Sequence, residues 1–196
     1  MAEPLLSARA LSCERDGRVL FESLDLDVAP GDIVELRGAN GSGKTTLLRC
    51  MAGLTQDFTG AIDRPARFVY LGHRGGLNRE LTALENLRWY AALEGVDGRA
   101  EVLERALADV GLAGYALTPC EQLSAGQQRR VTLARLRFAA AALWLLDEPL
   151  TALDDAGCDL VRSLLDGHRS RGGGAVCATH PLLGIAGIRS TTLGMH

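Results

Sequence analysis

The sequence predicts an α/β fold with a mainly parallel sheet, an antiparallel β edge and an inserted α-helical subdomain. Short apolar runs alternate along the chain with segments of helical spacing, which is the pattern of parallel strands covered by helices. Residues 5–11 and 19–28 instead alternate apolar and polar positions, as antiparallel strands with one exposed face do. Helical spacing dominates from about residue 75 to 140, so we expect the subdomain there.

The length and composition indicate one domain that spans residues 1–196. A chain of 196 residues with 47% hydrophobic content can bury a core, but it is short for two full domains. The formal net charge of −3 and the pI near 5.8 provide no basic surface for nucleic acid. We therefore expect a small ligand and no nucleic-acid partner.

The cysteines and the apolar segments bear on the compartment of the protein. Five cysteines occur without a C-x-x-C pair, namely Cys13, Cys50, Cys120, Cys158 and Cys177. They form either a disulfide or metal framework or a set of reduced packing residues, and the spacing and the lack of an export signal favour the second. The N-terminal segment has no apolar core of signal-peptide length, and no stretch approaches the roughly eighteen apolar residues of a membrane helix. We expect a chain that is neither exported nor membrane-spanning.

The remaining elements alternate between strands and helices. Residues 33–37 form a short strand that runs into a glycine-rich loop, and residues 44–53 continue with helical spacing. A buried strand is expected at 66–73, and Thr82 with Glu85 forms a capping box at the start of the next helix. Helices are further expected at 82–95, 99–112, 124–140 and 156–169, and strands at 141–146 and 175–179.

The stretch 38-GANGSGKTT-46 matches the phosphate-binding pattern G-x-x-x-x-G-K-[ST] between a strand and a helix. The backbone N–H groups of such a loop, together with the helix N-terminus, surround the phosphates of a nucleotide. Lys44 is expected to reach the β and γ oxygens, and Thr45 to bind Mg²⁺ through its hydroxyl. The predicted nucleotide-binding residues of this loop are Gly38, Ala39, Asn40, Gly41, Ser42, Gly43, Lys44, Thr45 and Thr46.

Two acids follow the apolar run 141–146. Asp147, at the carboxyl end of this predicted strand, is expected to hold Mg²⁺, and Glu148 to act as general base for the attacking water. An apolar run before two acids is a weak pattern alone, but its combination with the phosphate loop is specific. Together they predict a nucleoside triphosphatase.

The segment 123-LSAGQQRRVTLARL-136 resembles the LSGGQ signature of ATP-binding cassette (ABC) ATPases, and the order of elements matches that family from end to end. The resemblance implies a P-loop NTPase fold of the ABC ATPase type that binds and hydrolyses ATP with Mg²⁺. It also implies a head-to-tail homodimer in which the signature of each copy contacts the nucleotide of the other. The corresponding residues are Ser124, Ala125, Gly126 and Gln127, with Ala125 in place of the usual glycine.

Two further elements resemble those of the family. The segment 151-TALD-154 is similar to the loop that touches the partner's phosphate loop, which implies that Asp154 lies near the nucleotide of the other copy. His180 follows the predicted strand 175–179 and resembles the switch histidine that contacts the γ-phosphate. The expected catalytic residues are therefore Lys44, Glu148 and His180.

Two positions depart from the family pattern. The glutamine that most cassettes place shortly before the next helix is replaced by His73, which would then bind the metal and the cofactor; alternatively, His73 is an ordinary loop residue. Arg15 stands where an aromatic residue usually stacks on adenine. A guanidinium plane can also stack on a purine, and Phe21 is a second candidate for the base contact. Weak discrimination between ATP and GTP is the expected consequence.

The run 70-YLGHRGGLNRELTALENLRWY-90 and the opening 13-CERDGRVLF-21 resemble the ATP-binding subunit of the haem exporter of bacterial cytochrome c maturation. That resemblance implies a peripheral protein on the cytoplasmic face of the inner membrane. It also implies two integral membrane permease subunits as partners and haem as an indirect substrate. Several large apolar residues of the first run would then contact a permease, although some must belong to the core.

Other classes of function compete with this one. The same ATPase would suit another small exporter, or a soluble cassette protein that acts on nucleic acid or ribosomes. Cassettes of the second kind usually carry two ATPase domains, coiled-coil insertions or basic arms, none of which this sequence shows. A P-loop kinase or GTPase does not require an LSAGQ helix. The motifs therefore favour a transporter ATPase.

Overall fold

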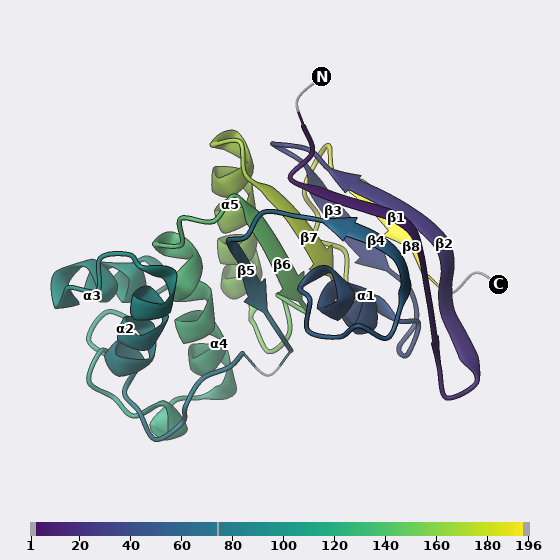
Figure 1. The fold of residues 1–196 in the computed structure, drawn as a ribbon. Coiled ribbons are helices and arrows are strands. Elements are labelled where there is room, and N and C mark those ends of the chain that lie inside the picture. Colours follow the sequence, from purple (N-terminus) through teal and green to yellow (C-terminus); the bar gives the residue numbers. More distant parts are fainter. Residues whose placement is uncertain (1–2, 74, 194–196) are drawn as a thin grey trace. The chain divides into compact units, whose positions relative to one another are not determined.

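The computed structural model describes residues 3–73 and 75–193 (Figure 1). Its internal contacts divide the chain into two compact units. The first unit contains the described residues of 1–71, 141–149 and 165–196, and the second contains those of 72–140 and 150–164. Helix α5 (Asp155–Ser170) begins in the second unit and ends in the first.

A five-stranded parallel sheet belongs to the first unit, with the strand order β5-β6-β7-β3-β8. All of its neighbouring strands pair in parallel, so their carboxyl ends lie along one edge of the sheet. This confirms the predicted mainly parallel sheet. Its strands are β3 (Ile33–Arg37), β5 (Phe68–Leu71), β6 (Leu143–Asp147), β7 (Gly174–Ala178) and β8 (Arg189–Thr192).

An antiparallel sheet of the order β2-β1-β4 belongs to the same unit and confirms the predicted antiparallel edge. Strands β1 and β2 are joined by Asp16 and Gly17, whose φ angles of 52° and 74° are those of a tight hairpin turn. The sequence interpretation identified β1 and β2 but missed β4. The strands are β1 (Leu6–Arg15), β2 (Arg18–Val28) and β4 (Thr59–Asp63).

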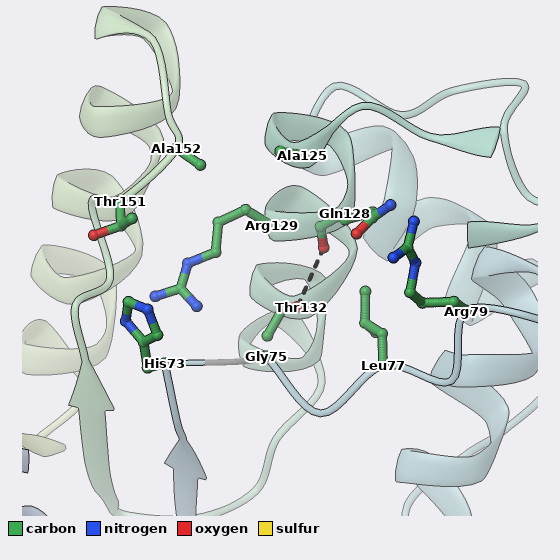
Figure 2. Close-up of a pocket in the computed structure, with 10 residues that line it drawn as sticks. All are labelled: His73, Gly75, Leu77, Arg79, Ala125, Gln128, Arg129, Thr132, Thr151 and Ala152. Atoms are coloured by element: carbon green, nitrogen blue, oxygen red, sulfur yellow. Dashed lines mark hydrogen bonds between the residues drawn. The ribbon is translucent and has the colours of Figure 1, made fainter. Parts of the chain in front are cut away.

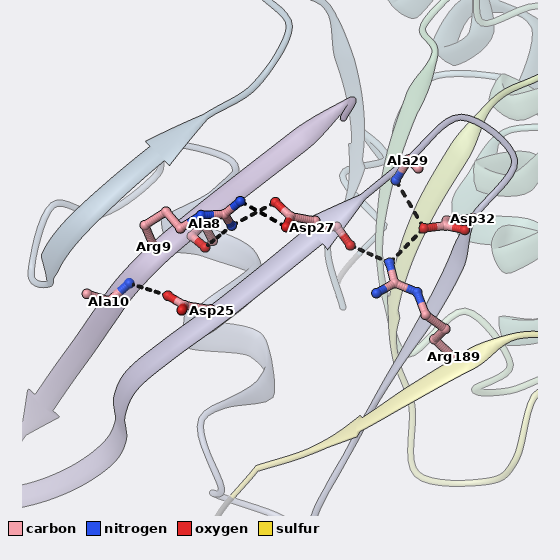
Figure 3. Close-up of polar contacts among 8 residues, drawn as sticks. All are labelled: Ala8, Arg9, Ala10, Asp25, Asp27, Ala29, Asp32 and Arg189. Atoms are coloured by element: carbon pink, nitrogen blue, oxygen red, sulfur yellow. Dashed lines mark hydrogen bonds and ion pairs between the residues drawn. The ribbon is translucent and has the colours of Figure 1, made fainter. Parts of the chain in front are cut away.

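Polar contacts tie the turn between β2 and β3 to the edge strand β8 (Figure 3). The Arg189 guanidinium donates to the backbone oxygen of Asp27 and, over 2.7 Å, to Asp32 Oδ2. Asp32 Oδ2 also accepts from the Ala29 N–H over 3.1 Å. One carboxylate thus closes the turn and holds the edge strand, whereas the Arg9–Asp27 ion pair is half exposed and stabilises little.

A stacked pair of rings lies in the core of the first unit. Trp144 on β6 is 1% exposed, and its ring centroid is 3.7 Å from that of His168 on α5, with 8° between the planes. His168 Nε2 lies 3.1 Å from the Ala142 oxygen and 3.2 Å from the Gly174 oxygen. The two carbonyls therefore fix the imidazole on which Trp144 packs.

We expect Trp144→Ala to lower the free energy of unfolding by about 3–5 kcal/mol, because it leaves a cavity and removes the stack. Urea unfolding followed by circular dichroism measures the change. Trp89→Ala is the matched control: Trp89 is 56% exposed, and its truncation should cost less than about 1 kcal/mol. Equal losses for the two variants would contradict the packing assigned to Trp144.

The second unit is helical, as the sequence predicts. The capping box before α2 is present: Thr82 Oγ1 accepts from the Glu85 N–H over 3.2 Å, and Glu85 Oε2 accepts from the Thr82 N–H over 2.8 Å. The boundaries at about 75 and 140 remain a prediction. The helices are α2 (Ala83–Glu94), α3 (Ala100–Asp109), α4 (Ala125–Ala134) and the short η1 (Cys120–Gln122) and η2 (Arg135–Arg137).

The apolar side chains of α2 divide between the core and the surface. Leu84, Leu87 and Tyr90 are buried, whereas Trp89 is 56% exposed and Leu93 is 65% exposed. Core packing therefore accounts for much of the apolar run in this segment. In the described part of the chain, no helix combines the length and the apolar character needed to cross a membrane.

The cysteines are free thiols, and all but Cys158 are buried. Burial is the main cause that raises the pKa of the Cys50 thiol to about 11, so this thiol stays protonated near neutral pH. Such thiols behave as small apolar side chains. The structure therefore agrees with reduced packing cysteines.

Candidate functional site

The phosphate loop lies between β3 and α1 (Lys44–Met51), as the motif predicts. Gly38, Gly41 and Gly43 have φ angles of 145°, 78° and 95°, which residues other than glycine rarely adopt. A Cβ atom on Gly38 would also lie 2.7 Å from the Leu193 oxygen. The glycines therefore allow the sharp bend between β3 and α1 that this motif requires.

Lys44 is the only lysine of the sequence, and it is buried within the loop. Its Nζ donates to the Gly38 oxygen over 2.7 Å and to the Ala39 oxygen over 3.0 Å. Ser42 Oγ is buried and has no hydrogen-bond partner among the described residues. A buried hydroxyl without a partner beside an ammonium group fits a ligand rich in anionic oxygen.

Thr45 connects the loop helix to the end of β6. Its Oγ1 donates to Asp147 Oδ1 over 3.0 Å, although the two residues are 102 positions apart in the sequence. Asp147 is 1% exposed and pairs with Ala178 across β6 and β7. A hydroxyl and a carboxylate thus meet at the carboxyl edge of the sheet, and both are oxygen ligands of the kind that Mg²⁺ prefers.

Glu148 and His180 follow the neighbouring strands β6 and β7. The Glu148 N–H donates to the Ala178 oxygen over 2.8 Å. The φ angle of Glu148 is 50°, in the left-handed region, where a glutamate is strained. Strained backbone of this kind is common at functional sites. His180 is exposed directly after Thr179. The same edge of the sheet therefore brings together the phosphate loop, Asp147, Glu148 and His180.

The signature segment lies at the N-terminus of α4 in the second unit. Ser124 is exposed, and its Oγ accepts from the Gln127 N–H over 3.2 Å, while Gln127 Oε1 accepts from the Ser124 N–H over 2.9 Å. A Cβ atom on Gly126 would lie 3.1 Å from the Ala152 oxygen. Ala125 begins the helix, a position that tolerates a side chain in place of the glycine of the LSGGQ pattern. The helix end remains accessible from outside the unit.

Asp154 makes contacts within the second unit. Its Oδ1 accepts from the Gly157 N–H over 2.9 Å and from Arg130 Nη2 over 2.8 Å. These two interactions, first the Gly157 N–H and then Arg130, hold the pKa of the Asp154 carboxyl below its usual value. Asp154 therefore caps α5 and connects it to α4.

His73 follows β5 and lines a cavity of about 220 Å³ in the second unit (Figure 2). Figure 2 shows the Arg129 side chain extending from α4 toward His73 and Thr151. The sequence interpretation did not single out Arg129, which is 7% exposed. Thr45 and Asp147 belong to the first unit, so the metal role of His73 remains a prediction.

Arg15 lines a cavity of about 530 Å³ together with Thr45 and Thr46 of the phosphate-loop helix. The Arg15 side chain is 67% exposed, and its Nε lies 3.8 Å from Asp16 Oδ2. This long contact leaves the guanidinium accessible. Phe21 is 2% exposed in the core, so it offers no ring face to a base. Of the two candidates for the base contact, only Arg15 lines this cavity.

One further polar residue escaped the sequence interpretation. Glu35 is 2% exposed in the middle of β3, directly ahead of the phosphate loop. The sequence contained a sign of this residue, because a glutamate interrupts the apolar run Ile33–Leu36 where a buried strand was expected.

Among the described residues there is no cluster of three or more histidine, cysteine or acidic side chains suited to hold a metal ion.

The family assignment follows from comparison with known proteins. The ABC transporter family profile matches residues 21–151. The cytochrome c biogenesis ATP-binding export protein CcmA of Saccharophagus degradans is 43% identical, over 96% of this chain and 92% of the relative. The protein of the same description from Pseudomonas savastanoi pv. phaseolicola is 47% identical, over 98% and 97%.

The fold of this chain also resembles solved structures of ABC transporter subunits. A chain described as the ATP-binding subunit of an ABC transporter matches with a TM-score of 0.81 and 26% identity, covering 91% of this chain and 80% of that chain. Along the chain, the phosphate loop comes first, the capped helix α4 second and the acids after β6 third, which is the order of motifs on which the resemblance to ABC ATPases rests. The chain therefore belongs to the ABC transporter family and, within it, to the group of the CcmA ATP-binding export proteins.

Proposed function

We propose that this chain is the ATP-binding and ATP-hydrolysing subunit of a haem exporter in cytochrome c biogenesis, which couples ATP hydrolysis to membrane subunits. The observation that carries the proposal is the Thr45–Asp147 contact of 3.0 Å, which joins the phosphate loop to the strand end that presents Glu148. The 43–47% identity to CcmA export proteins supports the transport role.

The phosphate loop would hold the triphosphate. The amides from Gly41 to Thr46 and the N-terminus of α1 provide hydrogen-bond donors and positive partial charge for phosphate oxygens. Lys44 would exchange its contacts with the Gly38 and Ala39 carbonyls for the β and γ oxygens. Thr45 and Asp147 would hold Mg²⁺, which supplies positive charge that stabilises the phosphates during transfer.

Hydrolysis requires a base and a group that orients water. We assign Glu148 as the general base, because it follows the metal-binding Asp147 and its backbone is fixed to β7 through the Ala178 oxygen. His180, at the end of the adjacent strand, would contact the γ-phosphate and orient the attacking water. Both roles place side chains at the carboxyl edge of the parallel sheet.

A second copy would complete the nucleotide site. The exposed N-terminus of α4, with Ser124, Ala125, Gly126 and Gln127, offers a second set of amide donors for phosphate. The Ser124 cap uses its Oγ as acceptor, so the hydroxyl hydrogen remains for an anionic ligand. We therefore propose an ATP-dependent homodimer, in which the exposed Asp154 segment of each copy approaches the phosphate loop of the other.

The proposed partners are two integral membrane permease subunits, and the proposed location is the cytoplasmic face of the bacterial inner membrane. Haem would be an indirect substrate, handled by the complex rather than bound by this subunit. The exposed Trp89 and Leu93 on α2 provide apolar surface of the kind that docks a partner helix.

Membrane sedimentation tests the transport role. The chain should pellet with inner-membrane vesicles when the two permease genes are co-expressed, and remain in the supernatant without them. Complexes recovered from these membranes should hydrolyse ATP and contain both permeases. ATP hydrolysis without any permease-dependent membrane association would support a non-transport ABC ATPase instead.

Arg15 predicts weak discrimination between purine nucleotides. A guanidinium plane stacks on adenine and guanine alike, so we expect the Kd values for ATP and GTP to differ by less than about tenfold. Competition binding with both nucleotides measures this ratio. Arg15→Ala should weaken both about tenfold, since base stacking contributes about 1–3 kcal/mol.

Arg18→Ala is the matched control for this experiment. Arg18 pairs with Arg15 across the hairpin, but it does not line the cavity beside Thr45 and Thr46. Arg18→Ala removes the same charge as Arg15→Ala, and it should leave the Kd values for ATP and GTP within about twofold of those of the wild-type chain. A strong ATP preference in the wild-type chain, or equal effects of the two substitutions, would reject the base contact.

A further inference from the structure

Glu35 is a buried carboxylate that the proposed nucleotide site does not use. It lies in the middle of β3 with 2% of its surface exposed, and its neighbours Val34 and Leu36 are buried apolar residues. A carboxylate at such a position is costly unless hydrogen bonds compensate the loss of water. Its contacts therefore indicate what it contributes.

Both oxygens of Glu35 accept hydrogen bonds from the segment that follows β7. Oε1 accepts from the Leu183 N–H over 2.7 Å, and this bond is buried. Oε2 accepts from the Ser190 hydroxyl over 3.1 Å, and Arg37 Nε lies 3.9 Å from the same oxygen. The short bond is thus made to a backbone amide, and the other contacts orient the carboxylate.

The segment with His180 is attached to β3 at both of its ends. The Thr179 N–H donates to the Leu36 oxygen over 3.3 Å. Four residues later, the Leu183 N–H donates to Glu35 Oε1 over 2.7 Å. Thr179 Oγ1 also donates to the Pro181 oxygen over 2.8 Å, which closes the turn around His180. The two anchors on β3 are adjacent residues, and the phosphate loop begins shortly after them.

His180 has no side-chain hydrogen bond to other described residues, and its side chain is exposed. Its position therefore depends on the backbone that carries it. We propose that Glu35 is a positioning residue for ATP hydrolysis: it fixes the segment 179–183 to the strand of the phosphate loop and so holds His180 near the γ-phosphate. This inference rests on the proposed role of His180.

A double-mutant cycle tests this role in the assembled complex. Glu35→Leu keeps a similar volume but leaves the Leu183 N–H without its acceptor. We expect kcat to fall about tenfold, because displacement of a catalytic group by a fraction of an ångström is enough for such a loss. The Kd for ATP should stay within about twofold, since the phosphate loop is unchanged.

The variant His180→Ala separates positioning from general stability. If Glu35 acts through His180, Glu35→Leu combined with His180→Ala should have the kcat of His180→Ala alone, within about twofold. Glu35→Gln retains an oxygen acceptor for the Leu183 N–H, so its kcat should also remain within about twofold of wild type. If Glu35→Leu does not fold, Glu35→Asp replaces it, because its shorter side chain withdraws the acceptor.

Multiplicative losses in the double variant would overturn the proposal, and so would an unchanged kcat in a folded Glu35→Leu or Glu35→Asp protein. A kcat for Glu35→Gln as low as that for Glu35→Leu would also contradict it. The proposed function fails differently, because in that case the wild-type complex itself would show no ATP hydrolysis.

Discussion

Lys44→Ala is expected to abolish ATP turnover and to weaken ATP binding by about a hundredfold or more, because hydrogen bonds to charged groups contribute about 1.5–3 kcal/mol each. Lys44 lies buried within the loop, where its Nζ bonds two loop carbonyls within 3.0 Å. Isothermal titration calorimetry at fixed Mg²⁺ measures the Kd, and release of inorganic phosphate measures turnover.

Lys44→Arg provides the matched variant for this experiment. It preserves the charge, but a planar guanidinium does not replace a compact ammonium between two carbonyls 2.7 and 3.0 Å away. We expect the arginine variant to bind ATP nearly as poorly as the alanine variant. Wild-type affinity in Lys44→Ala, with a folded protein confirmed by circular dichroism, would exclude this loop as the phosphate site.

Glu148→Gln should preserve ATP binding and lower kcat by about a thousandfold, within the range for loss of a general base. Its backbone bond to the Ala178 oxygen does not involve the carboxylate, so the local fold should persist. ATP that is not hydrolysed should then hold two copies together. Size-exclusion chromatography with and without ATP, in the presence of the permease subunits, detects the trapped dimer.

Two controls define the origin of this dimer. Glu104→Gln is a substitution of the same type at an exposed position on α3, and this variant should form no ATP-dependent dimer. Adding Ser124→Arg to Glu148→Gln should prevent the dimer, because a large side chain would block the exposed N-terminus of α4. A Glu148→Gln protein that remains monomeric at saturating ATP would contradict the assignment of the base and of the composite site.

The sequence predicted the elements whose signals are local. Strands β6 and β7 are buried at every position, so their apolar runs were visible. Strands β4 and β8 were missed because Thr59–Asp63 and Arg189–Thr192 are mainly exposed and lie at sheet edges, so neither shows an apolar run. Backbone pairing with β1 and β3, rather than burial, makes them strands, and no periodicity of side chains records that pairing.

The same distinction applies to the site. The phosphate loop is contiguous, so its spacing alone located it. Glu35 finds its partners 148 and 155 positions away, at Leu183 and Ser190, and only the folded sheet brings them together. Phe21 was a reasonable candidate by type, but the structure places its ring in the core, which the chain position does not reveal.

The presence of one lysine in the sequence makes the phosphate loop chemically addressable. Lys44 is the one lysine side chain that reagents for primary amines can acylate in this sequence, and its burial should make that reaction slow. Mass spectrometry of the labelled protein would then report loop occupancy directly. A nucleotide that engages the ammonium should shield it further, so the rate of labelling should fall as nucleotide is added.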